Sequence, residues 1–183
     1  MFGLRRKRYA MAIDTRRCVG CQSCVLACKA ENDVPAGAQR SWIRTETTGT
    51  YPDLAMTIYS ERCMHCANAP CVAACPTGAS HEGAGGAILV DRDLCTGCKA
   101  CVASCPYDAR SIHPAGYAEK CTFCMHRVER GLDPACAANC PTRAITFGDA
   151  NDPASPLASL LRSRRWTTLR PEMGTEPNLY FLL

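Results

Sequence analysis

Sixteen cysteines in a chain of 183 residues are the side chains best suited to chemistry. They fall into four runs of four with short intervals, and no cysteine is left over. The runs are Cys18, Cys21, Cys24 and Cys28; Cys63, Cys66, Cys71 and Cys75; Cys95, Cys98, Cys101 and Cys105; and Cys121, Cys124, Cys136 and Cys140. Thiolates spaced in this way ligate zinc or iron–sulfur clusters.

The second and third runs have the spacing of bacterial ferredoxins that hold two [4Fe–4S] clusters. Each has closely spaced cysteines and then a fourth before proline, as in CMHCANAPCVAACP and CTGCKACVASCP. Two residues between cysteines let a tight turn aim successive sulfurs at one cluster. The Cys-Pro step ends the loop and delivers its sulfur to the neighbouring cluster. We therefore predict four [4Fe–4S] clusters that are ligated by all sixteen cysteines.

Two other uses of so many cysteines fit less well. A secreted disulfide scaffold would explain an even count, but such scaffolds rarely repeat Cys-x-x-Cys-x-x-Cys and then Cys-Pro. A tetrahedral zinc site needs only two pairs, so the third cysteine of each tight run would have no role. The formal net charge of +4 does not indicate nucleic-acid binding. Four oxidised clusters with their thiolates would add roughly −8 to it.

Short apolar segments predict the strands and helices that position these loops. YAMAID at 9–14 and Ala87–Val90 are typical of buried strands, and Val25, Leu26 and Ala30 indicate a short helix through Cys28. The sequences CPTGA, CPYDA and CPTRA, which recur along the chain, indicate internal repeats. We predict an α+β fold of two duplicated bacterial-ferredoxin-like modules, with a β insertion and an extended C-terminal tail.

The insertion at 34–60 alternates apolar and polar residues around a break at Gly49, which predicts a β-hairpin. In the tail, 148–183, the spacing predicts a helix over 156–165 with Ser155 as its N-cap. The tail ends in LYFLL, and apolar side chains are costly to leave in water. Docking of this end on a partner subunit is favoured over docking on the chain's own modules.

The N-terminal residues 1–8 form a basic arm without the apolar stretch of a signal peptide. No apolar run approaches the ~20 residues of a membrane span. We therefore expect a chain that is either cytoplasmic or exported together with a partner that carries a signal.

Runs two and three lie close together in the sequence, so we pair them in one module, 61–105. Runs one and four then form the other module, from 9–33 and 106–147. The predicted ligand groups are Cys18, Cys21, Cys24 and Cys140; Cys28, Cys121, Cys124 and Cys136; Cys63, Cys66, Cys71 and Cys105; and Cys75, Cys95, Cys98 and Cys101. Spacing alone leaves a second pairing open, of run one with two and run three with four.

Basic residues lie beside several ligand cysteines, namely Lys29, Lys99, Lys120 and Arg143. A nearby cation would raise a cluster's potential by stabilising its reduced state. A solvated surface charge is the favoured alternative for each of them. We expect structural or hydrogen-bonding roles for the histidines, since sixteen cysteines already fill four cages.

The chain resembles the four-cluster electron-transfer subunits of the dimethyl-sulfoxide-reductase class of molybdenum oxidoreductases, most of all the iron–sulfur subunit of polysulfide/thiosulfate reductases. The matching segments cover nearly the whole chain and are YAMAID-x3-CVGC, CPTGAS, CPYDAR, HPAGY, KCTFC-x-HR, FGD and RPEMGT. In that family run one pairs with run four and run two with run three.

The resemblance implies a relay subunit with no catalytic residues. Its partners would be a molybdopterin-containing catalytic subunit and an integral-membrane, quinone-binding subunit. It would be membrane-associated through them, on the periplasmic face, with the cytoplasmic face as the alternative. A free-standing soluble polyferredoxin is the other candidate. An enzyme in its own right is disfavoured, because the sequence has no nucleophile–base pair and no nucleotide-binding loop.

Overall fold

The largest sheet in the computed structural model, which describes residues 6–183, has four strands. Its strand order is β8 (Ile145–Asp149), β1 (Tyr9–Asp14), β10 (Leu179–Leu182) and β9 (Trp166–Thr167). β1 runs antiparallel to β8 and parallel to β10. The strand predicted at 9–14 is thus confirmed, and it lies between two neighbours, as its apolar sequence requires.

The two faces of this sheet pack against different parts of the chain, because side chains alternate along a strand. Ala10 and Ala12 of β1 face helix α6 (Pro156–Ser163) through Leu157. Met11 and Ile13 face the cysteine-containing core. Ser155 stands at the N-cap of α6 as predicted, although its side chain makes no capping hydrogen bond, and the helix ends two residues earlier than expected.

The C-terminal strand corrects one prediction. β10 pairs with β1 from Met11 opposite Leu179 to Asp14 opposite Leu182, and all four of its residues are buried. The expectation that these apolar residues dock on a partner subunit is therefore wrong. The chain's own sheet covers them, and only the final Leu183 is exposed. The basic arm predicted at 1–8 lies mostly outside the described residues.

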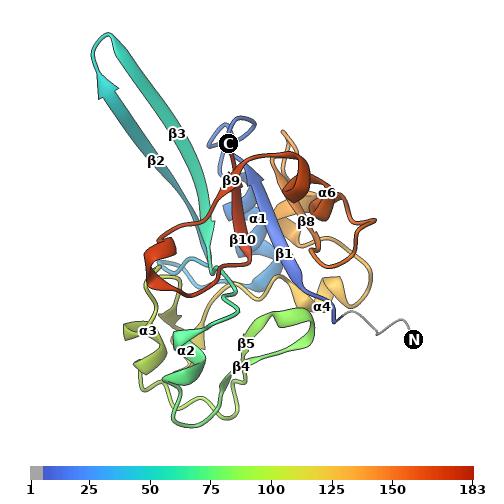
Figure 1. Cartoon of the computed structure of the whole chain (residues 1–183). Coiled ribbons are helices and arrows are strands. Elements are labelled where there is room, and N and C mark those ends of the chain that lie inside the picture. Colours follow the sequence, from blue (N-terminus) through green and yellow to red (C-terminus); the bar gives the residue numbers. More distant parts are fainter. Residues whose placement is uncertain (1–5) are drawn as a thin grey trace.

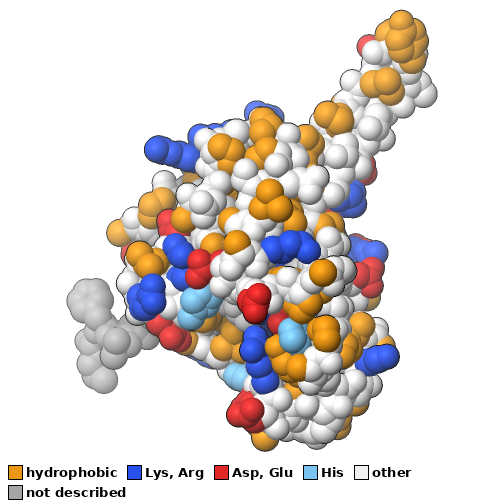
Figure 2. Space-filling model, turned by 180° about the vertical axis from the view of Figure 1, so that it is seen from behind, with side chains coloured by type: hydrophobic (Ala, Val, Ile, Leu, Met, Phe, Trp, Pro, Cys, Tyr) orange, Lys and Arg blue, Asp and Glu red, His pale blue; other side chains and the backbone are white. Residues whose placement is uncertain are grey.

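A long hairpin projects from the body of the molecule (Figure 1). Its strands are β2 (Ser41–Thr50) and β3 (Asp53–Arg62), which pair from Ser41 opposite Arg62 to Thr50 opposite Asp53. The base is buried and the outer half is exposed. Figure 2 shows apolar side chains along the projecting part, where Tyr51, Leu54 and Met56 are exposed.

Gly49 does not interrupt the hairpin, in contrast to the prediction, because it lies within β2 opposite Leu54. Its φ is +89°, in the region that favours glycine, and a Cβ there would lie 2.1 Å from the carbonyl oxygen of Asp53. The residue therefore belongs to the tight reversal at the tip.

Each cysteine loop leads into a short helix. These helices are α1 (Ser23–Asn32), α2 (Pro70–Ala73), α3 (Ala100–Ala103), α4 (Met125–Val128) and α5 (Ala135–Ala138). α1 packs against α5, and α2 packs against α3. Run one is thereby brought to run four, and run two to run three.

Two small hairpins lie between the loops, formed by β4 (Ser80–Glu82) with β5 (Ile88–Val90) and by β6 (Ser111–Ile112) with β7 (Ala118–Glu119). Two 3-10 turns, η1 (Ala84–Gly86) and η2 (Pro171–Met173), complete the chain. In Figure 1 the segments α2, α3, β4 and β5 lie below the four-stranded sheet. The chain is α+β, as predicted, and its sheets are small.

Candidate metal centres

The cysteines of the first predicted group surround a cavity beside the four-stranded sheet. Among its lining residues are Cys18, Cys21, Cys24 and Cys140. The backbone N–H of Ala144 donates to the sulfur of Cys140 over 3.3 Å. Three cysteines thus come from the loop before α1, and the fourth comes from the Cys-Pro step after α5.

A second cavity of the same construction is formed by cysteines of runs two and three. Among its lining residues are Cys75, Cys95, Cys98 and Cys101. The backbone N–H of Ser80 donates to the sulfur of Cys75 over 3.3 Å. In both Cys-Pro-Thr segments the threonine hydroxyl lies 3.7 Å from the cysteine sulfur. The repeated Cys-Pro-Thr sequence therefore gives the sulfurs of Cys75 and Cys140 the same hydrogen-bonding surroundings.

The remaining eight cysteines form two groups that lie deeper. The pKa of Cys28 is raised to about 11 by burial and by the nearby thiols of Cys136 and Cys124. Burial also raises the pKa of Cys121, and Cys28 and Cys136 add to that effect. These four side chains are near neighbours although they come from runs one and four.

The fourth group joins runs two and three. Burial raises the pKa of Cys66 to about 12. Thr175 opposes this rise through a hydrogen bond, whereas Cys63, Cys71 and Cys105 add to it. The structure thus brings together all four predicted groups, while their role as ligands stays a prediction.

These groups fit iron–sulfur clusters. Buried thiols that raise one another's pKa do not ionise at neutral pH by themselves, and a metal provides the positive charge that deprotonates them. Backbone N–H groups already point at several sulfurs, as expected for thiolate ligands. Within residues 6–183, no three histidine, cysteine or acidic side chains converge on the position of a single metal ion. In the two cavities the sulfurs instead surround a space.

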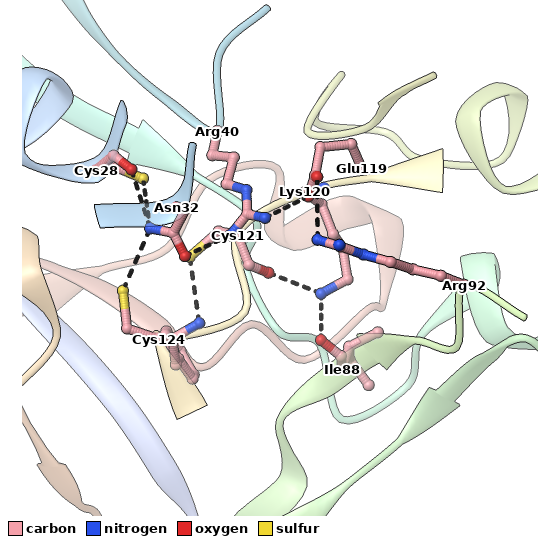
Figure 3. A network of polar contacts seen from close by, with 10 residues as sticks. Cys28, Asn32, Arg40, Ile88, Arg92, Glu119, Lys120, Cys121 and Cys124 are labelled. Atoms are coloured by element: carbon pink, nitrogen blue, oxygen red, sulfur yellow. Dashed lines mark hydrogen bonds and ion pairs between the residues drawn. The ribbon is translucent and has the colours of Figure 1, made fainter. Parts of the chain in front are cut away.

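A polar network connects the thiols of Cys28 and Cys124 to strand β7 (Figure 3). The side-chain amide of Asn32 lies 3.8 Å and 3.6 Å from these two sulfurs. Its carbonyl oxygen accepts a 2.7 Å hydrogen bond from Arg40. Arg40 also forms a buried 2.7 Å ion pair with Glu119. The charge of this arginine is therefore balanced by a carboxylate.

Arg62, at the end of β3, contacts one cysteine group directly and a second through Ser60. Its Nη1 donates to the sulfur of Cys136 over 2.8 Å, and its Nη2 donates to the hydroxyl of Ser60 over 2.5 Å. That hydroxyl lies 3.3 Å from the sulfur of Cys24. Burial lowers the pKa of Arg62, but nearby thiols, first that of Cys136, outweigh this and raise it. The residue therefore stays a cation.

Arg110 has the same surroundings in the other half of the molecule. Its Nη2 donates to the sulfur of Cys71 over 2.9 Å and to the hydroxyl of Ser80 over 2.8 Å. Burial lowers its pKa, and the thiols of Cys71, Cys63 and Cys101 raise it above its ordinary value.

Sequence reasoning missed both arginines. For Arg62 the one signal in the sequence was its position before Cys63, which belongs to a different group from the Cys136 that it contacts, and Arg110 carried no such signal.

The four basic residues singled out in the sequence differ in exposure. Lys99 and Arg143 are exposed, and Lys29 is half-buried with its Nζ on the carbonyl of Ala38. Lys120 is buried and donates to the carbonyls of Ile88 and Cys121. Of the four, Lys120 is thus the one that water does not screen.

The histidines have packing and hydrogen-bonding roles. His65 is buried and stacks on Phe123 with ring centroids 3.5 Å apart. Its Nδ1 accepts from the backbone N–H of Ile88. Burial keeps the pKa of His65 well below its usual value, so the ring is neutral. His126 pairs at the surface with Glu31, and His113 stacks on Tyr117.

Comparison with known protein families matches two regions of this chain. Residues 54–150 and residues 17–79 each match a family described as a 4Fe-4S dicluster domain. Together the two regions contain every cysteine. No helix within residues 6–183 has the length and apolar character needed to cross a membrane.

Curated relatives match along almost the whole chain. A tetrathionate reductase subunit of Salmonella typhimurium is 44% identical over 98% of this chain and 74% of its own length. A polysulfide reductase chain of Wolinella succinogenes is 42% identical over 96% of this chain and 94% of its own. A selenate reductase subunit of Mesobacillus selenatarsenatis is 35% identical over 98% and 73%, respectively.

Proposed function

Since this chain is a member of the 4Fe–4S dicluster family, we propose that it is the electron-transfer subunit of a respiratory reductase complex. Two dicluster domains and sixteen cysteines give four [4Fe–4S] clusters. Such clusters accept and release single electrons. The arrangement of all sixteen cysteines in four groups is the observation that carries this proposal.

The ligand groups we propose are those the fold brings together. They are Cys18, Cys21, Cys24 and Cys140; Cys28, Cys121, Cys124 and Cys136; Cys63, Cys66, Cys71 and Cys105; and Cys75, Cys95, Cys98 and Cys101. The first two belong to a module formed by 9–33 and 106–147, and the last two to a module at 61–105. Helix packing of α1 on α5 and of α2 on α3 supports this division.

The protein's own residues hold the sulfurs, donate hydrogen bonds to them and exclude water. Arg62 joins the two groups of one module, since it contacts Cys136 and, through Ser60, Cys24. Lys120 lies between the modules, with its Nζ on the carbonyls of Ile88 and Cys121. Cys63 of one module is close enough to add to the raised pKa of Cys121 of the other. In this proposal the four groups follow one another in a row, as a relay of single electrons requires.

The partners we propose are a molybdopterin-containing catalytic subunit and a quinone-reactive membrane subunit. The support is that the relatives are named as single subunits or chains of reductases. In this proposal the protein has no catalytic activity of its own and reaches the membrane through its partners. The hairpin β2–β3, which leaves Tyr51, Leu54 and Met56 in water, is the surface best suited to contact one of them.

Anaerobic purification under native conditions tests this function. We expect the protein to co-purify with a molybdenum-containing subunit and to carry about sixteen irons, which quinol reduces in the intact complex. A lone chain of the mass of one subunit that still carries four clusters would instead indicate a free polyferredoxin.

A further inference from the structure

Two arginines are buried beside the cysteine groups without a carboxylate partner. Arg62 is 1% exposed and Arg110 is 6% exposed. Within the described residues, neither forms an ion pair with an acidic side chain. Each donates to one serine hydroxyl and one cysteine sulfur. A buried cation of this kind is costly unless negative charge lies close to it.

Each arginine lies between the two cysteine groups of one module, although by sequence it belongs to the other module. Arg62 donates to Cys136 of one group, and its partner Ser60 lies 3.3 Å from the sulfur of Cys24 in the other. Arg110 donates to Cys71 of one group. Its partner Ser80 donates its backbone N–H to Cys75 of the other. Each arginine thus reaches one group directly and the other through a serine, by its hydroxyl at Ser60 and by its backbone N–H at Ser80.

Unpaired donors point to a further partner at both places. The Nε of Arg62, and the Nε and Nη1 of Arg110, are buried and make no hydrogen bond within residues 6–183. Buried donors of a cation are rarely left unsatisfied. Inorganic sulfides of the neighbouring clusters are acceptors of the right charge.

Arg40 shows what a balanced arginine looks like in the same interior. It is as buried as the other two and its Nε is likewise unpaired, but its Nη2 forms a 2.7 Å ion pair with Glu119, which also lies 3.8 Å from Arg92. Its field on the nearby thiols is therefore largely cancelled. The fields of Arg62 and Arg110 are not cancelled by a carboxylate, and the dry surroundings weaken them little.

We propose that Arg62 and Arg110 are shared electrostatic residues, each of which raises the reduction potentials of both clusters in the module that it contacts. This inference rests on the proposed function. One electron added to either cluster of a pair increases the negative charge beside the same guanidinium. A cation shared in this way raises both reduction potentials together. The difference in potential between the neighbouring clusters therefore stays small, while both become easier to reduce.

The test is a redox titration, followed by low-temperature EPR, of the full chain prepared anaerobically with its clusters. In Arg62→Gln we expect two of the four midpoint potentials to fall. At a fixed potential, the reduced-to-oxidised ratio should drop at least tenfold, which is 59 mV for a one-electron couple. In Arg110→Gln the other two should fall, and the double variant should lower all four. Because the two variants should shift different pairs of midpoint potentials, the test does not require that each EPR signal be assigned to a cluster beforehand.

Exposed basic residues beside the same loops provide matched controls. Arg143→Gln and Lys99→Gln each remove a charge near a cluster, but water screens both side chains, so we expect changes below threefold. Arg62→Lys keeps the cation. At a fixed potential, the reduced-to-oxidised ratio of each of the four clusters should therefore change by less than threefold. If Arg62→Gln loses clusters, the Arg62→Lys variant still tests the inference. A tenfold fall in the reduced-to-oxidised ratio although the charge is retained would overturn it.

Iron content separates the two possible failures. Four clusters with unmoved potentials in both glutamine variants, or the same two clusters moved by both, would refute the role of the arginines alone. Far fewer than about sixteen irons in the unmodified chain would refute the proposed function itself.

Discussion

The outer and inner cysteine groups of this molecule differ in their access to water. The outer groups each contain one exposed cysteine, Cys21 or Cys98, and one buried cysteine. In the inner group of runs one and four, Cys28, Cys121, Cys124 and Cys136 are all buried. In the other inner group only Cys105 is partly accessible.

This difference matches the two tasks of a relay. The ends must come within reach of donors and acceptors on other proteins, whereas the middle has only to pass electrons on without exposure to water or oxygen. Cys21 and Cys98 occupy equivalent positions, as the second cysteine in runs one and three. The internal repeat thus gives both exposed cysteines the same place in their runs, and in the proposed relay they would mark its two ends.

Ligand substitutions should break this comparison most strongly. Cys121→Ser removes a sulfur that is buried between both modules, so we expect failure of the folded chain and loss of two or more clusters. Cys21→Ser removes an exposed sulfur, and we expect a folded chain with about twelve irons. Iron analysis with circular dichroism measures both effects. Equal losses in the two variants would contradict the division into outer and inner groups.

Truncation of the core beside the inner groups should have the next largest effect. Phe181 of β10 is fully buried in the same cluster as Cys63, Cys121 and Cys136. Phe181→Ala should lower the free energy of unfolding by about 3–5 kcal/mol. Anaerobic denaturant titration measures this loss. The control is Leu183→Ala, at the exposed residue that follows β10. It should change the free energy of unfolding by less than about 0.5 kcal/mol.

When iron is removed, cysteines of the outer groups should react with an alkylating reagent faster than cysteines of the inner groups. Under a chelator and limited oxidant, we expect Cys21 and Cys98 to be alkylated several-fold faster than Cys121 and Cys136, since reagents reach them first. Mass spectrometry of samples taken at intervals gives the order. Simultaneous labelling of all four would mean that the clusters are lost in one cooperative unfolding event, not from the ends inward.

The sequence predicted the cysteine groups and most of the local elements. The Cys-x-x-Cys spacing and the position of runs two and three led to the same groups that the fold brings together. The strand at 9–14 and the hairpin after residue 34 followed from the apolar pattern. Such features depend on neighbours in the sequence, which is why they could be read there.

Features that depend on distant contacts could not be predicted. Arg62 adjoins Cys63 in the sequence but donates to Cys136, so adjacency suggests the wrong cysteine group. Arg110 lies five residues beyond Cys105 and contacts Cys71. The apolar tail had to be buried, but its composition does not say against what. Its pairing with β1 depends on the register of two strands at opposite ends of the chain.

The most direct test of the account is anomalous scattering at the iron edge from crystals of the anaerobically purified protein. We predict four iron clusters in a row, two outer ones beside Cys21 and Cys98 and two inner ones beside Cys121 and Cys63. Arg62 should lie between the first two clusters and Arg110 between the last two. Zinc at these positions, or a cluster ligated by cysteines of runs one and two together, would contradict it.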